Sequence, residues 1–438
     1  KPGQRAYVSE VVALTELDGK SLDEGVPLLG SQPGPASELL WAYGERADGA
    51  ISSGYPKLDG PGRERRRALV DRTPCPRKIA FYAGLLVGAD AREAELARDR
   101  ARRCGKEAAP VLLAVIEAAP TFREKGLLAE EAVITDAELA LPPLFQALSS
   151  AHGADDRRAL RRAVAKALVR EGGRRALGKA LADPAFTELA LGSQVEVLRA
   201  VADGVGQVES SPAAFALAAD RATEFRERFL LIEPAAVLAR AGDERARGFL
   251  ERALSDTEHK QLRVRAVRAS GAVPALSRLV SASLGDPEVR VREAALLSLA
   301  EREALDDKHV DPVLTLLVKD PWTFVRRAAA GTLVKVPADP AVDQSVAAAI
   351  DFEPMPEVRA AMVRTLAARG ATGAREAVAE RARDTREALE VRVAAVQALG
   401  ELCDRGEVQL LTDLALRGRA PLSEADRKLA IAALGSLA

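Results

Sequence analysis

The residue types that most often do chemistry are scarce in this chain of 438 residues. It has three histidines, His152, His259 and His309, and none lies within helical reach of another histidine or of a cysteine. A zinc site needs several such ligands to converge, and the HExxH and GxSxG patterns of metal- and serine-dependent hydrolases are absent from the sequence. We therefore predict no catalytic residue, no metal site and no cofactor, and expect each histidine to be a surface residue.

Cysteine chemistry is equally limited, because Cys75, Cys104 and Cys403 form no CxxC pair. Cys75 and Cys104 both lie in the N-terminal quarter and are the candidate disulfide pair, with two unrelated thiols as the open alternative. Cys403 follows a leucine in a helical pattern and is predicted to be a small buried residue. The first residue is Lys1, which indicates a processed or trimmed product. An exported, periplasmic or envelope location is favoured over the cytoplasm, but the sequence does not decide between them.

Basic residues gather in two parts of the chain. Residues 61–106 hold 13 basic residues against six acidic ones, and residues 155–179 hold nine against three. Between them, residues 107–154 hold two basic and seven acidic residues. Nucleic-acid-binding proteins usually present a continuous basic stripe with aromatic side chains, and this acidic block interrupts such a stripe. We therefore expect solvated helix faces and salt bridges between repeats.

Nucleic-acid binding is kept as the alternative function, through the basic clusters near 63–103 and 157–175. Its candidate contacts are Arg158, Arg162 and Arg175, and a steep loss of binding between about 50 and 200 mM salt would identify it. Arginine abundance alone is weak evidence, because 50 Arg, 13 Lys and no Asn are typical of a bacterial, GC-rich genome. The formal net charge of −1 excludes a global field that would attract nucleic acid or membranes.

Composition also excludes two other classes of protein. With 48% hydrophobic residues, many of them Ala, Leu and Val, the chain is too apolar for intrinsic disorder. No stretch approaches the roughly 20 uninterrupted apolar residues of a membrane span. The length is ample for a sizeable buried core.

The elements that must position these side chains change in character along the chain. Residues 1–61 are rich in Gly and Pro and are predicted to be an irregular N-terminal extension or cap. Trp41 is expected to anchor this segment on the first helices, with contact to a partner as the alternative. From residue 62 onward the pattern is that of amphipathic helices of roughly 10–15 residues. We predict degenerate helical repeats over 62–260 and regular ones over 261–438.

The regular repeats are marked by an arginine that follows an apolar residue and precedes small ones. Its successive spacings are 27, 34, 33 and 33 residues, which is typical of a helical repeat array. The repeated arginines are Arg265, Arg292, Arg326, Arg359 and Arg392. Residues 286–295 and 320–329 resemble the opening of a HEAT repeat of the short bacterial type. The resemblance is strong over about 260–438, degraded over about 62–260, and absent before residue 60.

The resemblance implies an all-α fold, namely a right-handed α-solenoid of stacked antiparallel helix pairs. Pro287 and Pro321 suit the first helical turn, where the missing N–H costs nothing. Asp286 and Asp320 precede them and can cap the free helix amides. The repeated arginines are expected to form a ladder that bonds to helix ends and to Asp side chains of adjacent repeats, with a charged binding strip as the alternative.

A solenoid offers a long continuous surface, and the sequence shows no catalytic constellation. We therefore predict a non-catalytic scaffold that binds a protein partner on the concave face, a link from fold to role that rests on analogy. Two enzyme alternatives are kept by resemblance: base excision, as in the HEAT-like DNA glycosylases, and protein modification, as in bilin-lyase-like repeat proteins. Few aromatic residues and unclustered cysteines argue against the second. The sequence leaves the identity of the partner and the oligomeric state open.

Overall fold

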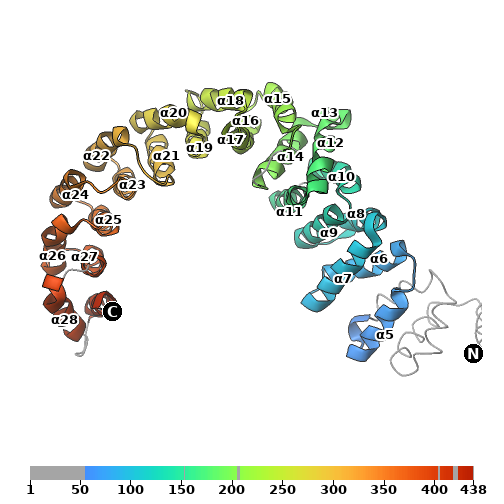
Figure 1. The fold of residues 1–438 in the computed structure, drawn as a ribbon, viewed down its shortest axis with the longest axis horizontal. Coiled ribbons are helices and arrows are strands. Elements are labelled where there is room, and N and C mark those ends of the chain that lie inside the picture. Colours follow the sequence, from blue (N-terminus) through green and yellow to red (C-terminus); the bar gives the residue numbers. More distant parts are fainter. Residues whose placement is uncertain (1–54, 152, 205–207, 403–404, 418–422, 438) are drawn as a thin grey trace, which may run out of the picture. The chain divides into compact units, whose positions relative to one another are not determined.

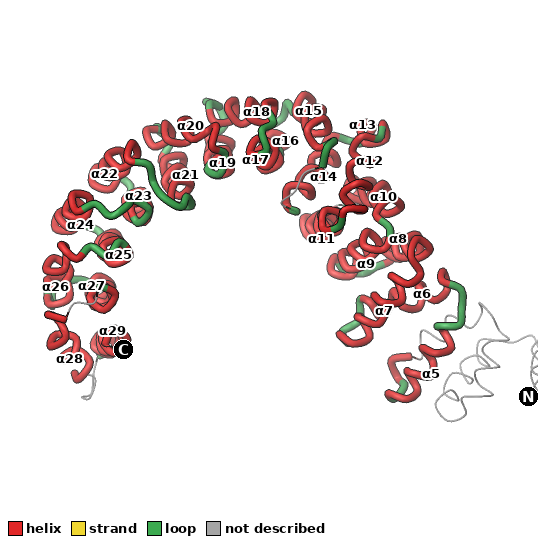
Figure 2. The backbone as a smooth tube through the Cα atoms, viewed as in Figure 1, coloured by secondary structure: helices red, strands yellow, loops and turns green. Residues whose placement is uncertain are grey.

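The computed structural model describes residues 55–437 apart from 152, 205–207, 403–404 and 418–422. These described residues form helices joined by turns and contain no strand (Figures 1 and 2). The prediction of an all-α fold is therefore confirmed. None of the described helices is both long enough and apolar enough to cross a bilayer. Trp41, His152 and Cys403 lie outside the described residues, as does almost all of the predicted extension 1–61.

The chain divides into two compact units, Lys1–Arg221 and Ala222–Ala438. The boundary drawn from the sequence at 260/261 marks instead the start of the regular repeat pattern, which lies within the second unit. The described helices of the first unit are η2 (Tyr55–Lys57), α5 (Gly60–Val70), α6 (Cys75–Leu86), α7 (Ala91–Cys104), η3 (Gly105–Glu107), α8 (Ala108–Ala118), α9 (Phe122–Thr135), α10 (Ala137–Ser150), α11 (Ala154–Lys166), η4 (Ala167–Val169), α12 (Glu171–Ala182), α13 (Pro184–Glu188), α14 (Leu191–Asp203) and α15 (Ser211–Arg221). Helices α7, α9, α11 and α14 pack side by side in one layer, and α6, α8, α10, α12 and α15 form the other.

The second unit is likewise a stack of helix pairs in two layers (Figure 1). Its described helices are α16 (Phe225–Leu230), α17 (Ile232–Arg240), α18 (Glu244–Leu254), α19 (Lys260–Ser270), η5 (Pro274–Leu276), α20 (Ser277–Ala282), η6 (Ser283–Gly285), α21 (Val289–Ala300), η7 (Asp307–His309), α22 (Val310–Lys319), α23 (Thr323–Leu333), α24 (Pro340–Phe352), α25 (Pro356–Ala368), η8 (Thr372–Ala374), α26 (Arg375–Arg383), α27 (Leu389–Glu401), η9 (Arg405–Glu407), α28 (Val408–Arg417) and α29 (Glu424–Leu437). Helices α19, α21, α23, α25, α27 and α29 contact one another in succession and line the concave face of this unit. We call them the inner helices; α20, α22, α24, α26 and α28 lie behind them.

Helix α21 shows how the sequence orients an inner helix. Val291, Ala295 and Leu299 recur at helical spacing and are fully buried, whereas Arg290 and Leu297 are exposed. The same buried position as Val291 recurs in the other inner helices at Leu262, Val325, Val358 and Val391. Because one side of each inner helix is buried against its neighbours, the opposite side faces the concave surface.

Hydroxyl groups join successive inner helices. Thr332 Oγ1 donates a hydrogen bond to the backbone oxygen of Leu296 at 3.0 Å, and Thr365 Oγ1 donates to that of Ala330 at 2.8 Å. Buried hydroxyl groups normally need such partners, so these bonds fix the spacing between repeats. Small residues allow the close approach: a Cβ added at Gly400 would lie 2.6 Å from a side-chain atom of the last inner helix.

The Asp-Pro pairs lie earlier relative to the helices than the sequence predicted. Pro287 stands two residues before α21, and Pro321 stands two residues before α23, so neither occupies a first helical turn. The Asp286 carboxylate accepts from the backbone N–H of Glu288 at 2.8 Å, and Asp320 makes the equivalent bond at 2.9 Å. These carboxylates therefore hold the turns that lead into the inner helices, and their second oxygens accept from Arg263 and Arg292.

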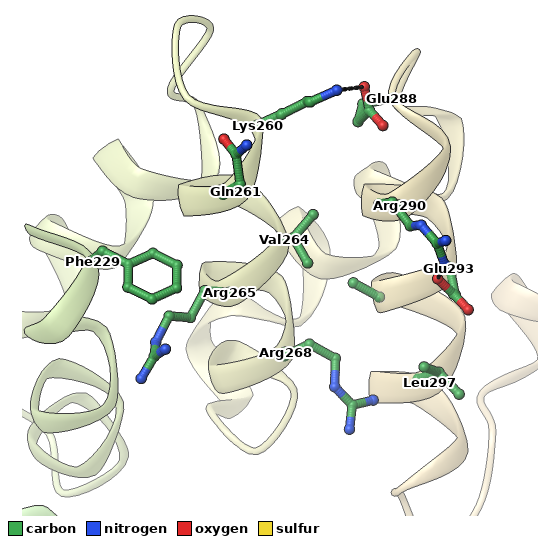
Figure 3. A pocket seen from close by; sticks show the side chains of 11 residues that line it. Phe229, Lys260, Gln261, Val264, Arg265, Arg268, Glu288, Arg290, Glu293 and Leu297 are labelled. Atoms are coloured by element: carbon green, nitrogen blue, oxygen red, sulfur yellow. Dashed lines mark hydrogen bonds and ion pairs between the residues drawn. The ribbon is translucent and has the colours of Figure 1, made fainter. Parts of the chain in front are cut away.

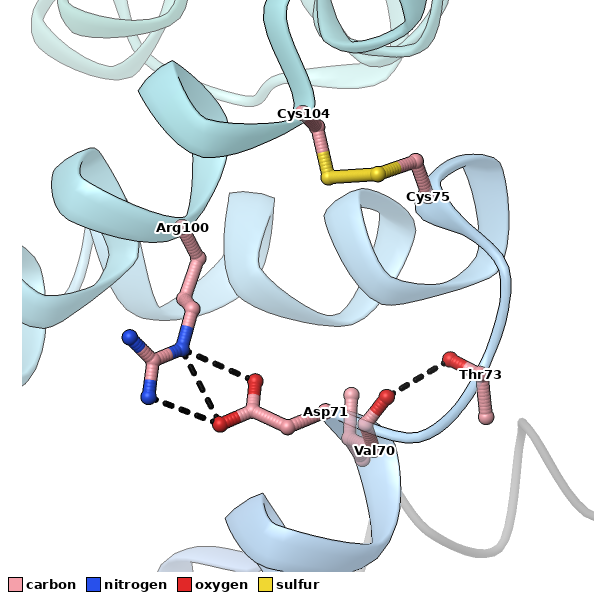
Figure 4. The surroundings of a disulfide bond; sticks show 6 residues. All are labelled: Val70, Asp71, Thr73, Cys75, Arg100 and Cys104. Atoms are coloured by element: carbon pink, nitrogen blue, oxygen red, sulfur yellow. Dashed lines mark hydrogen bonds and ion pairs between the residues drawn. A yellow bond between two sulfur atoms is a disulfide. The ribbon is translucent and has the colours of Figure 1, made fainter.

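Cys75 and Cys104 form a disulfide in the first unit (Figure 4). Cys75 is the first residue of α6 and Cys104 is the last residue of α7, and their Cα atoms are 5.7 Å apart. A second link lies one helical turn before Cys104, where Arg100 donates to both carboxylate oxygens of Asp71 at 2.8–3.0 Å. One covalent and one ionic link thus tie α7 to α6 and to the turn before it.

Candidate binding surface of the second unit

Arginines near the start of the inner helices connect the repeats of the second unit from α19 to α27. Arg292 Nε and Nη2 donate to the carboxylate of Asp320 at 2.7 and 3.2 Å, and Nη1 donates to the backbone oxygen of Asp286 at 2.9 Å. One guanidinium therefore holds its own repeat and the next one, with the two-nitrogen geometry that suits a carboxylate. The other rungs of this ladder are Arg263 with Asp286, Arg326 with Glu353, and Arg359 with Glu387.

Two of the arginines grouped by sequence spacing are placed differently. Arg263 holds the ladder position on α19, whereas Arg265 binds none of the ladder carboxylates and lies on the concave face. Two residues along an α-helix rotate a side chain by about 200°, which sends these neighbours to opposite sides. Arg392 donates to the backbone oxygen of Ala382 at 3.4 Å.

The ladder arginines have few donors left for a ligand. Arg326 uses Nε and Nη2 on the Glu353 carboxylate and Nη1 on the backbone oxygen of Asp320. Hydrogen bonding to Glu353 raises the pKa of Arg326 above its ordinary value, so the charge on this rung is permanent. The arrangement supplies rigidity, and the candidate site lies where the inner helices leave side chains exposed.

A groove of about 520 Å³ lies on the concave face over α16, α19 and α21 (Figure 3). Its apolar part is formed by Val264 on α19 and by Ala294 and Leu297 on α21. Leu297 is 40% exposed, which is unusual for a leucine on a helix that buries its other apolar residues. An apolar depression with a few polar groups around it is typical of a binding site.

Arg265 is held in one orientation at the α16 end of this groove. Its guanidinium carbon lies 4.2 Å from the centroid of the Phe229 ring, within the range of a cation–π contact. Its Nη2 donates to Glu233 at 2.5 Å. Figure 3 shows Phe229 beside this side chain, so an aromatic face and a carboxylate together fix the guanidinium.

Three further cations surround the apolar part, and each is bound to a carboxylate. Arg268 Nη2 donates to Glu301 at 2.5 Å, and Lys260 Nζ donates to Glu288 at 3.4 Å. Arg290 Nη1 donates to Glu293 at 2.8 Å, and its guanidinium carbon lies 4.2 Å from the Phe324 ring centroid. The groove therefore combines an apolar centre with charged walls of both signs.

Two guanidinium nitrogens in the groove walls stand out. Among the described residues, Arg265 Nε and Arg268 Nη1 are buried and have no hydrogen-bond partner. Most buried polar groups in proteins do have one. These two donors lie one helical turn apart, on the same side of α19.

The structure separates the candidate nucleic-acid contacts of the first unit. Arg158 and Arg162 are exposed on α11, whereas Arg175 is exposed on α12 in the other layer and lies 3.5 Å from Glu171. Neighbouring basic residues bind carboxylates of the acidic block: Arg102 with Glu131, Lys166 with Glu130, and Lys179 with Glu138. The geometry thus brings together two of the three candidates.

One group of potentially catalytic residues was not predicted from sequence. His309 Nε2 hydrogen-bonds with Ser281 Oγ, and Asp306 lies 3.7 Å from Nδ1. In a catalytic triad the carboxylate accepts the Nδ1 proton and orients the ring, but within the described chain Nδ1 has no hydrogen-bond partner. His309 is 1% exposed, so the prediction of a surface histidine was wrong; burial lowers its pKa. Its contacts are those of a residue that packs η7 against α20.

The remaining residues with potential for chemistry are dispersed. His259 is partly exposed and stacks on Phe225 with ring centroids 5.1 Å apart. In the part of the chain that the structure describes, no three His, Cys, Asp or Glu residues are arranged to hold a metal ion. The chemistry that the groove supports is therefore binding through apolar contact and guanidinium donors.

Comparison with known proteins agrees with the architecture. Residues 345–435 match the family model of HEAT repeats. The chain carries HEAT repeats. This confirms the resemblance seen in the sequence, and the match falls within the repeats from α24 to α29. No curated protein matches the chain in sequence.

Solved structures show the same type of HEAT-repeat fold. Kap121p matches with a TM-score of 0.50 at 10% identity over 99% of this chain and 53% of that chain, and a Kap121p mutant matches with a TM-score of 0.51 over the same shares. The chain thus spans about half the length of Kap121p. Human deoxyhypusine hydroxylase matches at 19% identity over 61% of this chain and 97% of that chain, but its TM-score of 0.26 is too low to show a common fold. At these identities the likeness to Kap121p concerns the fold alone.

Sequence reasoning missed Phe229, Arg268 and Leu297. No one-dimensional pattern shows that the short helix α16 lies beside α19, so Phe229 carried no signal. Leu297 did carry one, since the equivalent repeat positions are occupied by residues that are not apolar: Arg268, Gly331, Arg364 and Gln397. An apolar residue at a position that is otherwise polar or glycine indicates a contact outside the repeat.

Proposed function

We propose that this protein is a non-catalytic scaffold that binds a protein partner on the concave face of its second unit, over the groove formed by α16, α19 and α21. The observation that carries the proposal is the exposed apolar centre of this groove, with Leu297 in it, between guanidinium groups held by aromatic rings and carboxylates. Protein interfaces combine such an apolar centre with a polar rim. Arginines and aromatic residues are the side chains most enriched there.

The repeat architecture supports this role. From α19 to α27 each repeat is joined to the next by an arginine–carboxylate rung, and hydroxyl groups add bonds between inner helices. A surface held in this way is ordered before the partner arrives, which lowers the conformational cost of binding. The concave face therefore offers the partner a preformed surface.

The test is affinity purification of the intact protein from its native host, with and without nuclease, followed by mass spectrometry. Three forms are compared: wild type, Leu297→Asp, and the matched control Val318→Asp. Val318 is 57% exposed on α22, behind the inner helices. Both substitutions replace an exposed apolar residue on a helix by a charge, but only one lies in the groove.

We expect a stoichiometric, nuclease-resistant protein to co-purify with wild type and Val318→Asp. Leu297→Asp should lose it, because the side chain that the partner would bury contributes about 1.5–3 kcal/mol, or roughly tenfold or more in affinity. Circular dichroism of all three proteins checks that they fold alike. Retention of the partner by Leu297→Asp, or the absence of any stoichiometric protein, contradicts the proposal.

The nucleic-acid alternative is judged by the same purification. It rests on Arg158 and Arg162, which are exposed four residues apart on α11. Nuclease-sensitive co-purification that is lost in the Arg158→Ala/Arg162→Ala variant, and that weakens steeply with salt, would replace the scaffold proposal. We expect neither effect.

A further inference from the structure

The chemistry of the groove narrows the class of partner, an inference that rests on the proposed function. The starting point is a departure from the repeat. Three residues after its buried apolar position, each inner helix from α21 to α27 carries alanine: Ala294, Ala328, Ala361 and Ala394. Helix α19 carries Arg265 at this position. A large charged side chain therefore occupies a position at which the other repeats carry alanine.

The Arg265 side chain is held in the groove by specific contacts. Phe229 and Glu233 hold one side of the guanidinium, at 4.2 Å to the ring centroid and 2.5 Å to the carboxylate. Its Nε is nevertheless left without an acceptor among the described residues. The side chain is therefore oriented, partly exposed to the groove, and incompletely bonded.

Arg268 repeats this arrangement one turn along α19. Its Nη2 donates to Glu301, while its Nη1 has no acceptor in the described part of the chain. The side chain is partly exposed and lines the same groove. Two guanidinium groups with missing acceptors thus line the same groove, Arg265 on the Phe229 side and Arg268 on the Leu297 side (Figure 3), and a buried donor without an acceptor is costly to leave unpaired.

The carboxylates of the groove do not supply these acceptors. Glu288 is bound to Lys260 at 3.4 Å, and Glu293 is bound to Arg290 at 2.8 Å. Four basic residues and two acidic ones line the groove in all. Glu233 and Glu301 lie outside the lining but pair with Arg265 and Arg268, so what α19 offers an anion is the unbonded edges of these two guanidinium groups.

We infer that the groove binds a peptide segment of the partner that presents an Asp or Glu carboxylate beside an apolar side chain. The carboxylate accepts hydrogen bonds from Arg268, whose guanidinium lies on the Leu297 side of the groove (Figure 3), as the planar guanidinium fork favours. The apolar side chain rests on Val264 and Leu297. The unpaired Nη1 of Arg268 is itself buried, but the side chain is 39% exposed, so binding requires a rotation of this guanidinium that turns Nη1 to the ligand.

A phosphate backbone fits the same groove less well. Nucleic acid carries a charge on every nucleotide, and Glu288 and Glu293 in the walls would oppose a run of phosphates. It also offers no aliphatic side chain for Leu297. The acidic peptide is therefore the occupant that satisfies both the donors and the apolar centre.

The experiment uses the full chain, immobilised, and a phage-displayed library of random dodecapeptides. Selected peptides are synthesised with a fluorescent label, and their affinities are measured by fluorescence polarisation. The protein variants are Arg268→Ala, Arg268→Glu, Leu297→Asp and the control Arg278→Ala. Arg278 is exposed on α20, behind the inner helices.

We expect the selected peptides to share an acidic residue next to an apolar one. Arg268→Ala should weaken their binding by about tenfold, the effect of losing a charge-assisted hydrogen bond, while Arg278→Ala changes it by less than about twofold. Replacing the acidic residue of the peptide by Gln should weaken binding to wild type equally. Replacing it by Lys should restore binding to Arg268→Glu, a rescue that misfolding cannot produce.

Each contrary result has a separate meaning. Peptides that lack an acidic residue, or that bind Arg268→Ala as tightly as wild type while Leu297→Asp abolishes binding, overturn the inference and leave the scaffold proposal standing. Displacement of the peptide by a single-stranded oligonucleotide, with the same dependence on Arg268, overturns it in favour of nucleic acid. Failure to select any peptide counts against both.

Discussion

Arg326→Ala removes three hydrogen bonds made by one buried side chain. Nε and Nη2 bind the Glu353 carboxylate at 2.7 and 2.8 Å, and Nη1 binds the backbone oxygen of Asp320 at 2.9 Å. The two ion-paired side chains are only 9% and 3% exposed. Removing one partner of a buried pair costs about 3–5 kcal/mol, because the other charge remains buried. Glu353 keeps the hydrogen bond from a backbone N–H at 2.9 Å, so we expect the lower end of this range, about 3 kcal/mol.

The chain offers a matched control in the next residue. Arg327 is exposed on the same helix, and Arg327→Ala should change the free energy of unfolding by no more than about 0.5 kcal/mol. The double variant Arg326→Met/Glu353→Gln should recover most of the loss, because neither charge is then left buried alone.

The assay is urea unfolding of the full chain followed by circular dichroism, together with native-state hydrogen exchange. In a repeat array each unit is stabilised by its neighbours, so faster exchange should begin at α23 and α25, on either side of the broken rung. The reasoning is refuted if Arg326→Ala lowers the free energy of unfolding by less than about 1 kcal/mol, or if Arg327→Ala lowers it equally.

Two further predictions concern His309 and the disulfide. Burial lowers the pKa of His309 below its ordinary value of 6.5, so the native state favours the neutral ring; the stability this contributes is present above pH 6.5 and is lost as the pH falls toward the lowered pKa. The stability difference between wild type and His309→Gln, measured by thermal unfolding, should therefore shrink from pH 7 to pH 5, and a constant difference contradicts the assignment. The disulfide joins residues 29 positions apart, and chain entropy predicts that the Cys75→Ser/Cys104→Ser variant loses about 3.5 kcal/mol. Reducing agent should lower the melting temperature of wild type but not that of the variant.

Much of the architecture was predictable from sequence because it depends on periodicity. The position of Val291 recurs once per repeat, and each inner helix buries it, so the apolar pattern alone indicates stacked helix pairs. Helix boundaries were less predictable. Asp286 accepts from the amide two residues ahead and from Arg263, a tertiary partner that the local sequence does not reveal, and α21 begins only at Val289, after Pro287.

The ladder register on α19 shows a second limit. Arg263 and Arg265 both stand after an apolar residue and before smaller ones, so a pattern search aligns either with Arg292. A slip of two residues leaves the sequence pattern almost unchanged but rotates the side chain by about 200°. Only the packing of α19 against both neighbours shows that Arg263 contacts Asp286, just before α21, and that Arg265 contacts Phe229 on α16.

The same two-residue shift in register explains why the candidate site could not be predicted from the pattern of the regular repeats. Natural proteins break their own local rules mainly at functional or strained positions, and α19 breaks the repeat by carrying arginine where its neighbours carry alanine. When Arg265 is grouped with the ladder arginines, the sequence pattern does not show that it departs from the repeat. Because Arg263 holds the rung, Arg265 is not needed for the ladder; it contacts Phe229 and Glu233 instead, and its Nε has no partner among the described residues. In a repeat protein of this kind, the charged residues that take no part in the ladder are therefore the first candidates for a binding site.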